Sequence, residues 1–83
     1  SLVHQDAFAV ISDWYHFAIL DLTLLKNFKS DTRWIAKKLD ITHFEANLAI
    51  ERLIRLGLLK EHQGRLVKTE MHFSNYTEGQ TSA

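Results

Sequence analysis

The basic side chains of this chain all lie between positions 26 and 68, and basic side chains are the groups that bind phosphate. That span holds ten Lys and Arg residues against five Asp and Glu residues, a net charge of +5. The flanking residues carry the other five acidic side chains and no basic one, so the whole chain is neutral. A chance imbalance on a solvated surface explains this segregation about as well as a phosphate-binding module does.

Side chains suited to catalysis or metal binding form no known motif. The chain has no Gly-rich phosphate loop, no G-x-S-x-G elbow and no H-E-x-x-H sequence. Asp13 and His16 are three apart and could form a metal or proton-relay pair, but a His that hydrogen-bonds locally is far commoner. The absence of cysteine excludes disulfides and Cys-based zinc sites. We therefore expect no enzyme, no metal site and no cofactor.

Length and composition indicate one small soluble domain. The 83 residues are 46% hydrophobic and 24% charged, which is ordinary for a folded chain. No apolar run approaches the roughly 20 residues that span a bilayer. The N-terminal "SLVHQDAF" lacks the basic flank and apolar core of a signal peptide. We expect a cytoplasmic domain without a membrane partner, and the missing initiator Met suggests a fragment of a longer chain.

The spacing of apolar residues predicts two helices in the first half of the chain. From Ala7 to Leu25 these residues recur every three or four positions, the period of an amphipathic helix. Ser12 and Asp13 are good N-cap types, so we place the helix start there. Residues 7–11 would then be a short strand or extended lead-in, and a single helix from Asp6 is the alternative. A further helix is expected over residues 32–40, capped by Ser30 or Asp31.

The turn at residues 40–42 leads to the most clearly signalled helix. Thr42 and Glu45 have the spacing of a capping box, and Gly57 is a suitable C-cap. At 100° per residue, the core face of this helix comprises Ala46, Ala49, Ile50, Leu53 and Leu56. Its opposite face comprises Phe44, Asn47, Leu48, Glu51, Arg52 and Arg55.

Two short runs at residues 58–62 and 65–69 predict a β-hairpin. They are separated by Gln63 and Gly64, and Gly supplies the positive φ that such a turn needs. Helix, helix, turn, helix and hairpin follow one another as in a winged helix-turn-helix, so we expect a mainly α fold of three core helices plus a wing. We divide the chain into a lead-in at 1–11, the winged domain at 12–68 and a partly disordered tail at 69–83.

The expected helix-turn-helix defines candidate DNA contacts. The second helix of such a motif presents its N-terminal residues to base edges, while the first helix and the wing meet phosphates. The base-contact candidates are His43, Asn47 and Arg52. The phosphate-contact candidates are Arg33, Lys37, Lys38, Arg65 and Lys68. The alternative for each candidate is an ordinary solvated side chain, and Arg52 and Arg55 could instead pair along the helix with Glu51 or Glu45.

Phe44 and Leu48 support a different interpretation. They are four apart on the outward face and would form a small apolar ridge, which could touch thymine methyls but more often marks a protein contact. Glu51 on the same face would repel phosphate. The alternative to DNA binding is therefore a winged-helix protein-interaction or dimerisation module without direct DNA contact.

Several segments resemble an uncharacterised family of bacterial proteins that are grouped with transcriptional regulators. They are "ISDWYHFAIL", "WIAKKLDIT", "EANLAIERLIRLGLL" and the basic hairpin, within residues 8–68, and the most specific are D-W-Y-H and A-x-E-R-L-x-R-L-G-L. The resemblance implies a winged-helix domain within a longer regulator-like protein. Its expected partners are double-stranded DNA and either a second copy or other domains of the full-length protein. Asp40 stands where such turns usually carry Gly.

Overall fold

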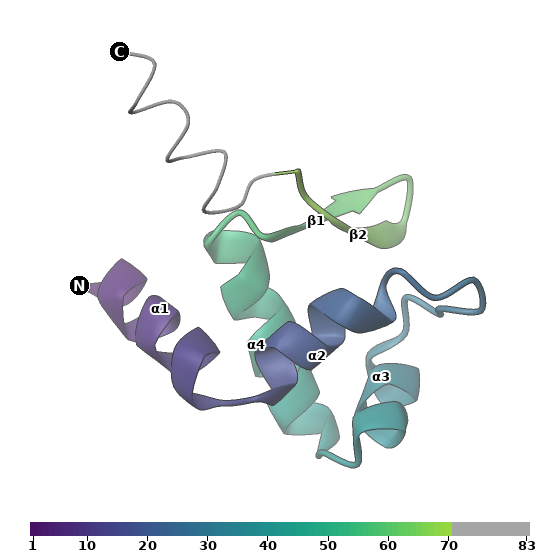
Figure 1. Ribbon diagram of the computed structural model, residues 1–83, viewed down its shortest axis with the longest axis horizontal. Coiled ribbons are helices and arrows are strands. Elements are labelled where there is room, and N and C mark those ends of the chain that lie inside the picture. Colours follow the sequence, from purple (N-terminus) through teal and green to yellow (C-terminus); the bar gives the residue numbers. More distant parts are fainter. Residues whose placement is uncertain (71–83) are drawn as a thin grey trace.

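The computed structural model describes residues 1–70, which form four helices and one β-hairpin. In chain order the elements are α1 (Leu2–Ser12), α2 (Tyr15–Leu22), α3 (Thr32–Leu39), α4 (His43–Arg55), β1 (Leu59–His62) and β2 (Arg65–Lys68). In Figure 1, α4 runs through the middle, with α1 on one side and α3 and the hairpin on the other. This mainly α fold with a hairpin wing confirms the predicted fold class. The tail expected to be disordered lies, from residue 71 on, outside the described residues.

The N-terminal segment is a helix, so the preferred interpretation of residues 7–11 as a strand was wrong. Helix α1 begins with Ser1 as its N-cap, and it ends where the backbone of Asp13 becomes extended, with φ −103° and ψ 105°. Its two buried residues, Asp6 and Val10, are four apart and therefore share one helical face against the rest of the domain. In a strand these two residues would also share a face, but they would lie about 13 Å apart instead of about 6 Å.

The break near residue 12 was predicted, but its cap was not. The Ser12 hydroxyl donates to the Phe8 carbonyl at 2.7 Å, so this side chain closes α1 instead of starting α2. Helix α2 begins at Tyr15 with Trp14 at the N-cap position and no side-chain cap. The expectation that Ser12 or Asp13 caps the second helix was therefore wrong.

Helices α3 and α4 form the helix-turn-helix that the sequence predicts. Asp31 caps α3 by accepting from the Arg33 N–H at 3.1 Å. Asp40 makes the turn in the left-handed conformation, with φ 56° and ψ 45°, which Asp tolerates better than most residues. Thr42 and Glu45 satisfy each other's backbone N–H groups at 2.9 and 3.0 Å, which confirms the capping box.

Loss of this cap should be measurable. We expect Thr42→Ala to lower the free energy of unfolding by about 1 kcal/mol, because one N–H at the start of α4 loses its side-chain acceptor. Urea titration followed by circular dichroism measures the change. Thr42→Ser keeps the hydroxyl and should remain close to wild type, and an equal loss in both variants would contradict a role for the cap.

One hydrophobic core lies against the inner face of α4. Four of the five predicted core residues of this helix, Ala46, Ala49, Ile50 and Leu53, are buried, whereas Leu56 is half-buried at the edge. Helices α1, α2 and α3 and strand β1 all contact α4. The remaining core side chains come from these elements and from the α2–α3 connection, and they are Val10, Ile19, Leu20, Phe28, Ile35, Ala36 and Leu59.

The hairpin is tied to the helices at its base and at its outer strand. Leu59 pairs with Lys68 and His62 with Arg65, and the turn residues Gln63 and Gly64 both have positive φ, 53° and 77°. Two positive values are the mark of a type I′ turn. The Leu66 N–H donates to the Ser30 hydroxyl at 2.9 Å, which attaches the wing to the start of the helix-turn-helix. Among residues 1–70, every helix falls short of the length and apolar character needed to cross a bilayer.

Candidate nucleic-acid interface

The outward strip of α4 begins with the two polar side chains that were predicted to meet bases. His43 is the first residue of the helix and Asn47 lies one turn later, and both are exposed. The Asn47 amide donates to the Glu51 carboxylate at 3.4 Å, a long and therefore weak hydrogen bond. The Asn47 amide is thus on the free face of the helix and available to a stronger partner.

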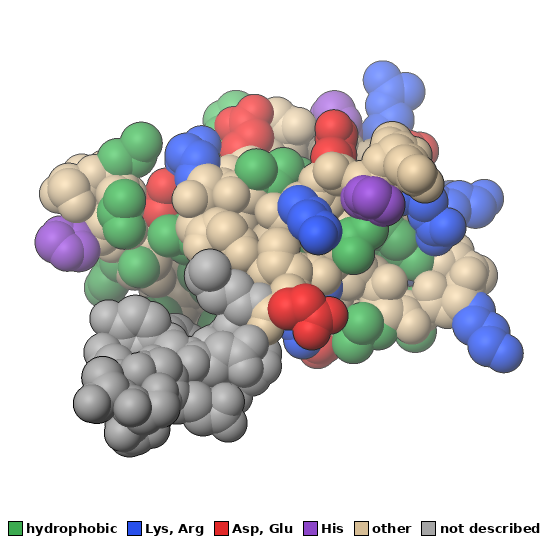
Figure 2. Space-filling model, turned by 90° about the horizontal axis from the view of Figure 1, so that it is seen from above, with side chains coloured by type: hydrophobic (Ala, Val, Ile, Leu, Met, Phe, Trp, Pro, Cys, Tyr) green, Lys and Arg blue, Asp and Glu red, His purple; other side chains and the backbone are tan. Residues whose placement is uncertain are grey.

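The predicted phosphate contacts lie on the elements beside this strip. Arg33, Lys37 and Lys38 are exposed on α3, and Arg65 and Lys68 are exposed on β2. Most of the Lys and Arg side chains visible in Figure 2 lie at the end of the molecule formed by α3, the hairpin and the α2–α3 connection. The fold thus brings positive charge from two separate segments of the chain to one end of the domain.

Aromatic packing fixes the position of one of these cations. The Lys38 Nζ atom lies 5.4 Å from the centre of the Trp34 ring, within the range of a cation–π interaction. Trp34 in turn packs edge-to-face on Phe28, with ring centroids 5.7 Å apart. Trp34 is half-buried at the edge of the core. The ammonium group of Lys38 therefore lies over the Trp34 ring, while the side chain as a whole stays exposed.

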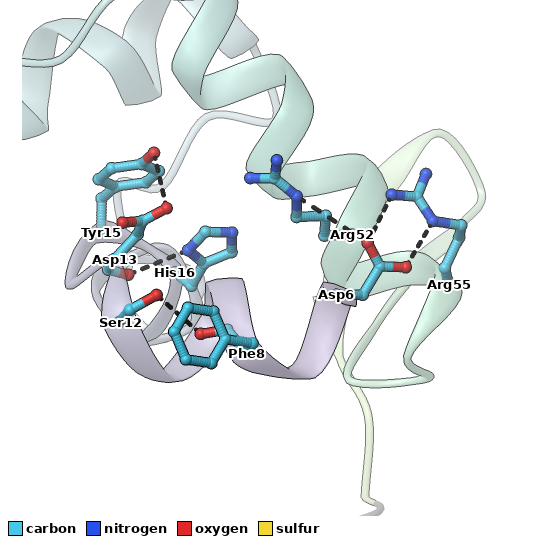
Figure 3. A network of polar contacts seen from close by, with 8 residues as sticks. All are labelled: Asp6, Phe8, Ser12, Asp13, Tyr15, His16, Arg52 and Arg55. Atoms are coloured by element: carbon cyan, nitrogen blue, oxygen red, sulfur yellow. Dashed lines mark hydrogen bonds and ion pairs between the residues drawn. The ribbon is translucent and has the colours of Figure 1, made fainter. Parts of the chain in front are cut away.

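Arg52, the third predicted base contact, is engaged elsewhere. It is half-buried, and its Nε atom lies 3.9 Å from the carboxylate of Asp6 in α1. Arg55 donates to both oxygens of the same carboxylate, at 2.8 and 2.9 Å (Figure 3). Within residues 1–70 both arginines form their ion pairs with Asp6, not with Glu51 or Glu45 as the helical spacing suggested. His43 and Asn47 are therefore better placed than Arg52 to meet a base.

Sequence reasoning missed Asp6, which is separated from Arg55 by 49 positions. One signal was present, because Asp6 is the only charged residue of α1 and directly precedes the apolar run of residues 7–11. A buried carboxylate needs a cationic or hydrogen-bonding partner. The hydrogen bonds from Arg55 hold the pKa of the Asp6 carboxyl below its ordinary value, although burial opposes them, and the positive charges of Arg55 and Arg52 add to the lowering.

This lowered pKa makes the stability of the domain pH-dependent. Ionised Asp6 stabilises the fold above its unfolded-state pKa of about 4, and that contribution is lost as the pH falls through the lower folded-state value. We expect Asp6→Asn to be less stable than wild type at neutral pH and to lose less stability on acidification. Urea titrations over a pH series measure both effects.

An exposed carboxylate provides the matched control. Asp21→Asn alters an exposed acidic residue of α2 and should leave the neutral-pH stability near that of wild type. Equal neutral-pH stabilities for Asp6→Asn and Asp21→Asn would contradict the role assigned to the Asp6–Arg55 pair.

Asp13 and His16 make local hydrogen bonds, as expected for a structural His and not for a metal or proton-relay pair. His16 is completely buried, and its Nδ1 atom lies 3.0 Å from the backbone carbonyl of Asp13, which fixes Nδ1 as the donor. The imidazole ring stacks on Tyr15 at 5.0 Å between centroids, and the Asp13 carboxylate accepts from the Tyr15 hydroxyl at 3.4 Å. Figure 3 shows this cluster beside the Asp6 ion pairs. The contacts of Asp13 and His16 therefore stabilise the α1–α2 junction.

The apolar ridge predicted on α4 is reduced to one residue. Phe44 is 70% exposed, whereas Leu48 is half-buried. The free strip of this helix therefore comprises His43, Phe44, Asn47 and Glu51, with Ile54 exposed near its C-terminal end. It is a mixed surface, with polar groups and one aromatic ring near the N-terminus and an acidic group two turns later.

Comparison with known proteins identifies the family. Neither the curated proteins nor the solved structures contain a match to this chain. A family model with the description "Domain of unknown function (DUF4423)" matches residues 1–83. Because that model covers the chain from end to end, the protein belongs to the DUF4423 family.

Proposed function

We propose that this domain binds double-stranded DNA through α3, α4 and the hairpin, as the DNA-binding part of a cytoplasmic bacterial transcriptional regulator. The observation that carries the proposal is the surface around the N-terminal half of α4. Exposed His43 and Asn47 stand there beside an α3 helix and a wing that both carry exposed Lys and Arg. Helix-turn-helix proteins place base-reading and phosphate-binding side chains in this order.

The dimensions of α4 suit insertion into the major groove. Its 13 residues form a rod roughly 20 Å long, and the groove is about 12 Å wide. Asn47 can pair with the edge of adenine through two hydrogen bonds, and Phe44 can contact a thymine methyl. Glu51 lies about 6 Å further along the helix axis than Asn47, and its carboxylate accepts the weak 3.4 Å hydrogen bond from the Asn47 amide, so binding of Asn47 to a base exchanges this contact for the bonds to adenine.

The charges on α3 and the wing supply the affinity that does not depend on sequence. A duplex carries one negative charge per roughly 1.7 Å and a condensed layer of counterions, which Lys and Arg displace. Lys37 and Lys38 on α3 and Arg65 and Lys68 on β2 are exposed and free to take this role. Arg33 at the start of α3 is a further candidate.

Fluorescence anisotropy with a labelled mixed-sequence duplex tests this function. We expect binding at low salt, with the logarithm of the association constant falling linearly as the logarithm of the salt concentration rises. A chain that leaves the duplex free even at the lowest salt would refute the proposal.

A selection from a pool of random duplexes tests the base contacts. We expect the wild type to enrich a preferred site and Asn47→Ala to lose about 1–3 kcal/mol of discrimination at one base pair of it. The variant should keep its affinity for mixed sequence, because the phosphate contacts are untouched. Unchanged discrimination would remove Asn47 from the interface.

The exposure of Phe44 favours a second candidate, a protein-interaction module that does not touch DNA. An aromatic side chain that is 70% exposed on a helix is a common anchor in protein interfaces. Phe44→Glu separates the two functions. On a DNA-binding surface the new charge faces phosphate and weakens duplex binding, whereas a module without DNA contact has no duplex binding to lose.

A further inference from the structure

Two arginines of α4 lie on the side of this helix that faces α1. Arg52 follows Leu48 by one helical turn and Arg55 follows Arg52 by three positions, so the three side chains form one stripe along α4. The sequence predicted that this stripe faces outward, yet Leu48 and Arg52 are half-buried. Arg55 lies one turn after Glu51, so the stripe borders the free strip of α4 that we propose for DNA.

A single carboxylate from α1 holds both arginines. The buried Asp6 accepts two hydrogen bonds from Arg55, at 2.8 and 2.9 Å, and lies 3.9 Å from the Nε atom of Arg52 (Figure 3). A guanidinium binds the oxygens of a phosphate with the same pair of parallel N–H donors. Asp6 thus occupies the donors with which Arg55 would bind a phosphate.

The two sides of α4 differ in their available positive charge. Helix α3 and the hairpin lie on one side of α4, and α1 lies on the other (Figure 1). The exposed Lys and Arg residues of α3 and β2 are on the first side. On the second side, Arg52 and Arg55 are paired with Asp6. A helix in the major groove has a phosphate backbone on each side, so with α1 in place the second backbone meets arginines that are already neutralised.

Helix α1 is packed lightly enough to open. Of its 11 residues, Asp6 and Val10 are the buried ones. A helix of this length is marginal in water without tertiary packing. Elements with few buried contacts open locally at a smaller cost than that of unfolding the whole domain. Opening of α1 would uncover the guanidinium groups of Arg52 and Arg55.

We propose that α1 is an autoinhibitory element of the DNA-binding site, which withholds Arg52 and Arg55 from the duplex when it is docked on α4. When α1 opens, phosphate replaces the Asp6 carboxylate as the partner of these arginines. The inference rests on the proposed DNA-binding function and adds a regulation of the same site. Docking of α1 and binding of DNA then oppose each other, and each weakens the other by the same factor.

Fluorescence anisotropy of the 83-residue chain with a mixed-sequence duplex tests the proposal. We expect Asp6→Asn to raise the affinity at low salt on the order of 10-fold and to steepen the dependence of log affinity on log salt by up to about 2, because two further phosphate contacts form. Asp21→Asn is the matched control, since it removes the same negative charge from an exposed position of α2, and its salt dependence should remain that of wild type.

Substitution of the arginines identifies the source of the gain. In the Asp6→Asn background, Arg52→Gln and Arg55→Gln together should return the salt dependence to that of wild type. In the wild-type background the same two substitutions should leave the salt dependence unchanged, because the paired arginines make no phosphate contact. Circular dichroism under the conditions of the titrations verifies that each variant is folded.

A second variant loosens α1 without changing any charge. Val10→Ala removes apolar contacts of α1 with the core and should raise the affinity for the duplex in the same direction as Asp6→Asn. This variant decides the matter if loss of the buried ion pair prevents Asp6→Asn from folding.

Amide hydrogen exchange gives a readout on the wild type itself. Saturation with the duplex should speed exchange in α1, by up to the factor that Asp6→Asn gains in affinity, because DNA favours the open form. The same duplex should slow exchange in the N-terminal half of α4, which it covers.

The possible failures of the two proposals are distinguishable. A wild type that leaves the duplex free at the lowest salt refutes DNA binding and the autoinhibition with it. A wild type that binds, with Asp6→Asn and Val10→Ala no tighter, overturns the autoinhibition alone. So does a gain in Asp6→Asn that survives replacement of both arginines. Slower exchange in α1 on addition of the duplex would make α1 part of the interface and would also contradict the inference.

Discussion

Replacing Lys37, Lys38, Arg65 and Lys68 with Gln should lower the affinity for mixed-sequence DNA on the order of 100-fold or more at low salt. The slope of log affinity against log salt should also become shallower by about 3–4, because each lost phosphate contact removes about 0.9 from it. All four side chains are exposed, so Gln removes each charge with little change in packing, apart from the cation–π contact of Lys38 with Trp34. Anisotropy titrations at several salt concentrations measure both effects.

A charge-conserving variant separates electrostatics from altered packing. The set Lys37→Arg, Lys38→Arg, Arg65→Lys and Lys68→Arg keeps every positive charge and should retain a slope close to that of wild type. If the Gln variant bound with the wild-type slope, α3 and the wing would lie away from the duplex, and the proposed docking geometry would be wrong.

The largest expected loss of stability comes from the middle of α4. Leu53 is completely buried in the core, and Leu53→Ala should lower the free energy of unfolding by about 2–5 kcal/mol, because it removes apolar contacts and leaves a cavity. A domain of this size has a small margin, since the net stability of folded proteins is only about 5–15 kcal/mol. Urea titration of the variant measures the loss.

The next residue along the helix supplies the control for this prediction. Ile54 is 42% exposed, so Ile54→Ala removes contacts mostly with water and should cost much less than Leu53→Ala. Similar losses for the two variants would mean that α4 is rotated about its axis relative to the core described above.

Local signals in the sequence were sufficient for the helix-turn-helix and the wing. Thr42 and Glu45 lie three positions apart, and their capping box depends on little beyond that spacing. Gln63 and Gly64 determine the hairpin turn in the same local way. Apolar periodicity correctly identified the buried face of α4, because a 13-residue helix presents several turns of the pattern.

The N-terminal segment could not be predicted correctly from such signals. Val10 and Ile11 are β-branched, which favours a strand, and no capping pattern marks the start of α2. What favours the helix is packing across the chain, since α1 contacts α4 and a helix places the buried Asp6 and Val10 one turn, about 6 Å, apart, whereas a strand would separate them by about 13 Å. Tertiary packing routinely overrides local propensities of this size.

The candidate interface was likewise only partly predictable from the sequence. The exposed polar and basic residues on α3, α4 and the wing could be predicted from the sequence, because an amphipathic pattern predicts which face of a helix points outward. The partner of Arg52 could not be predicted in this way, because it is the carboxylate of Asp6 in the distant helix α1. Leu48 was expected on the outer face and is half-buried.

The sequence by itself thus determined the caps, the turns and the core face of the helix-turn-helix, because each depends on residues within a few positions of one another. Only the tertiary structure decided that residues 2–12 form a helix, that Asp6 pairs with two arginines of α4, and that several large apolar side chains of the N-terminal segment stay exposed. These features depend on which distant segments become neighbours, and the energy of a buried ion pair or an uncovered face exists only once the chain has folded.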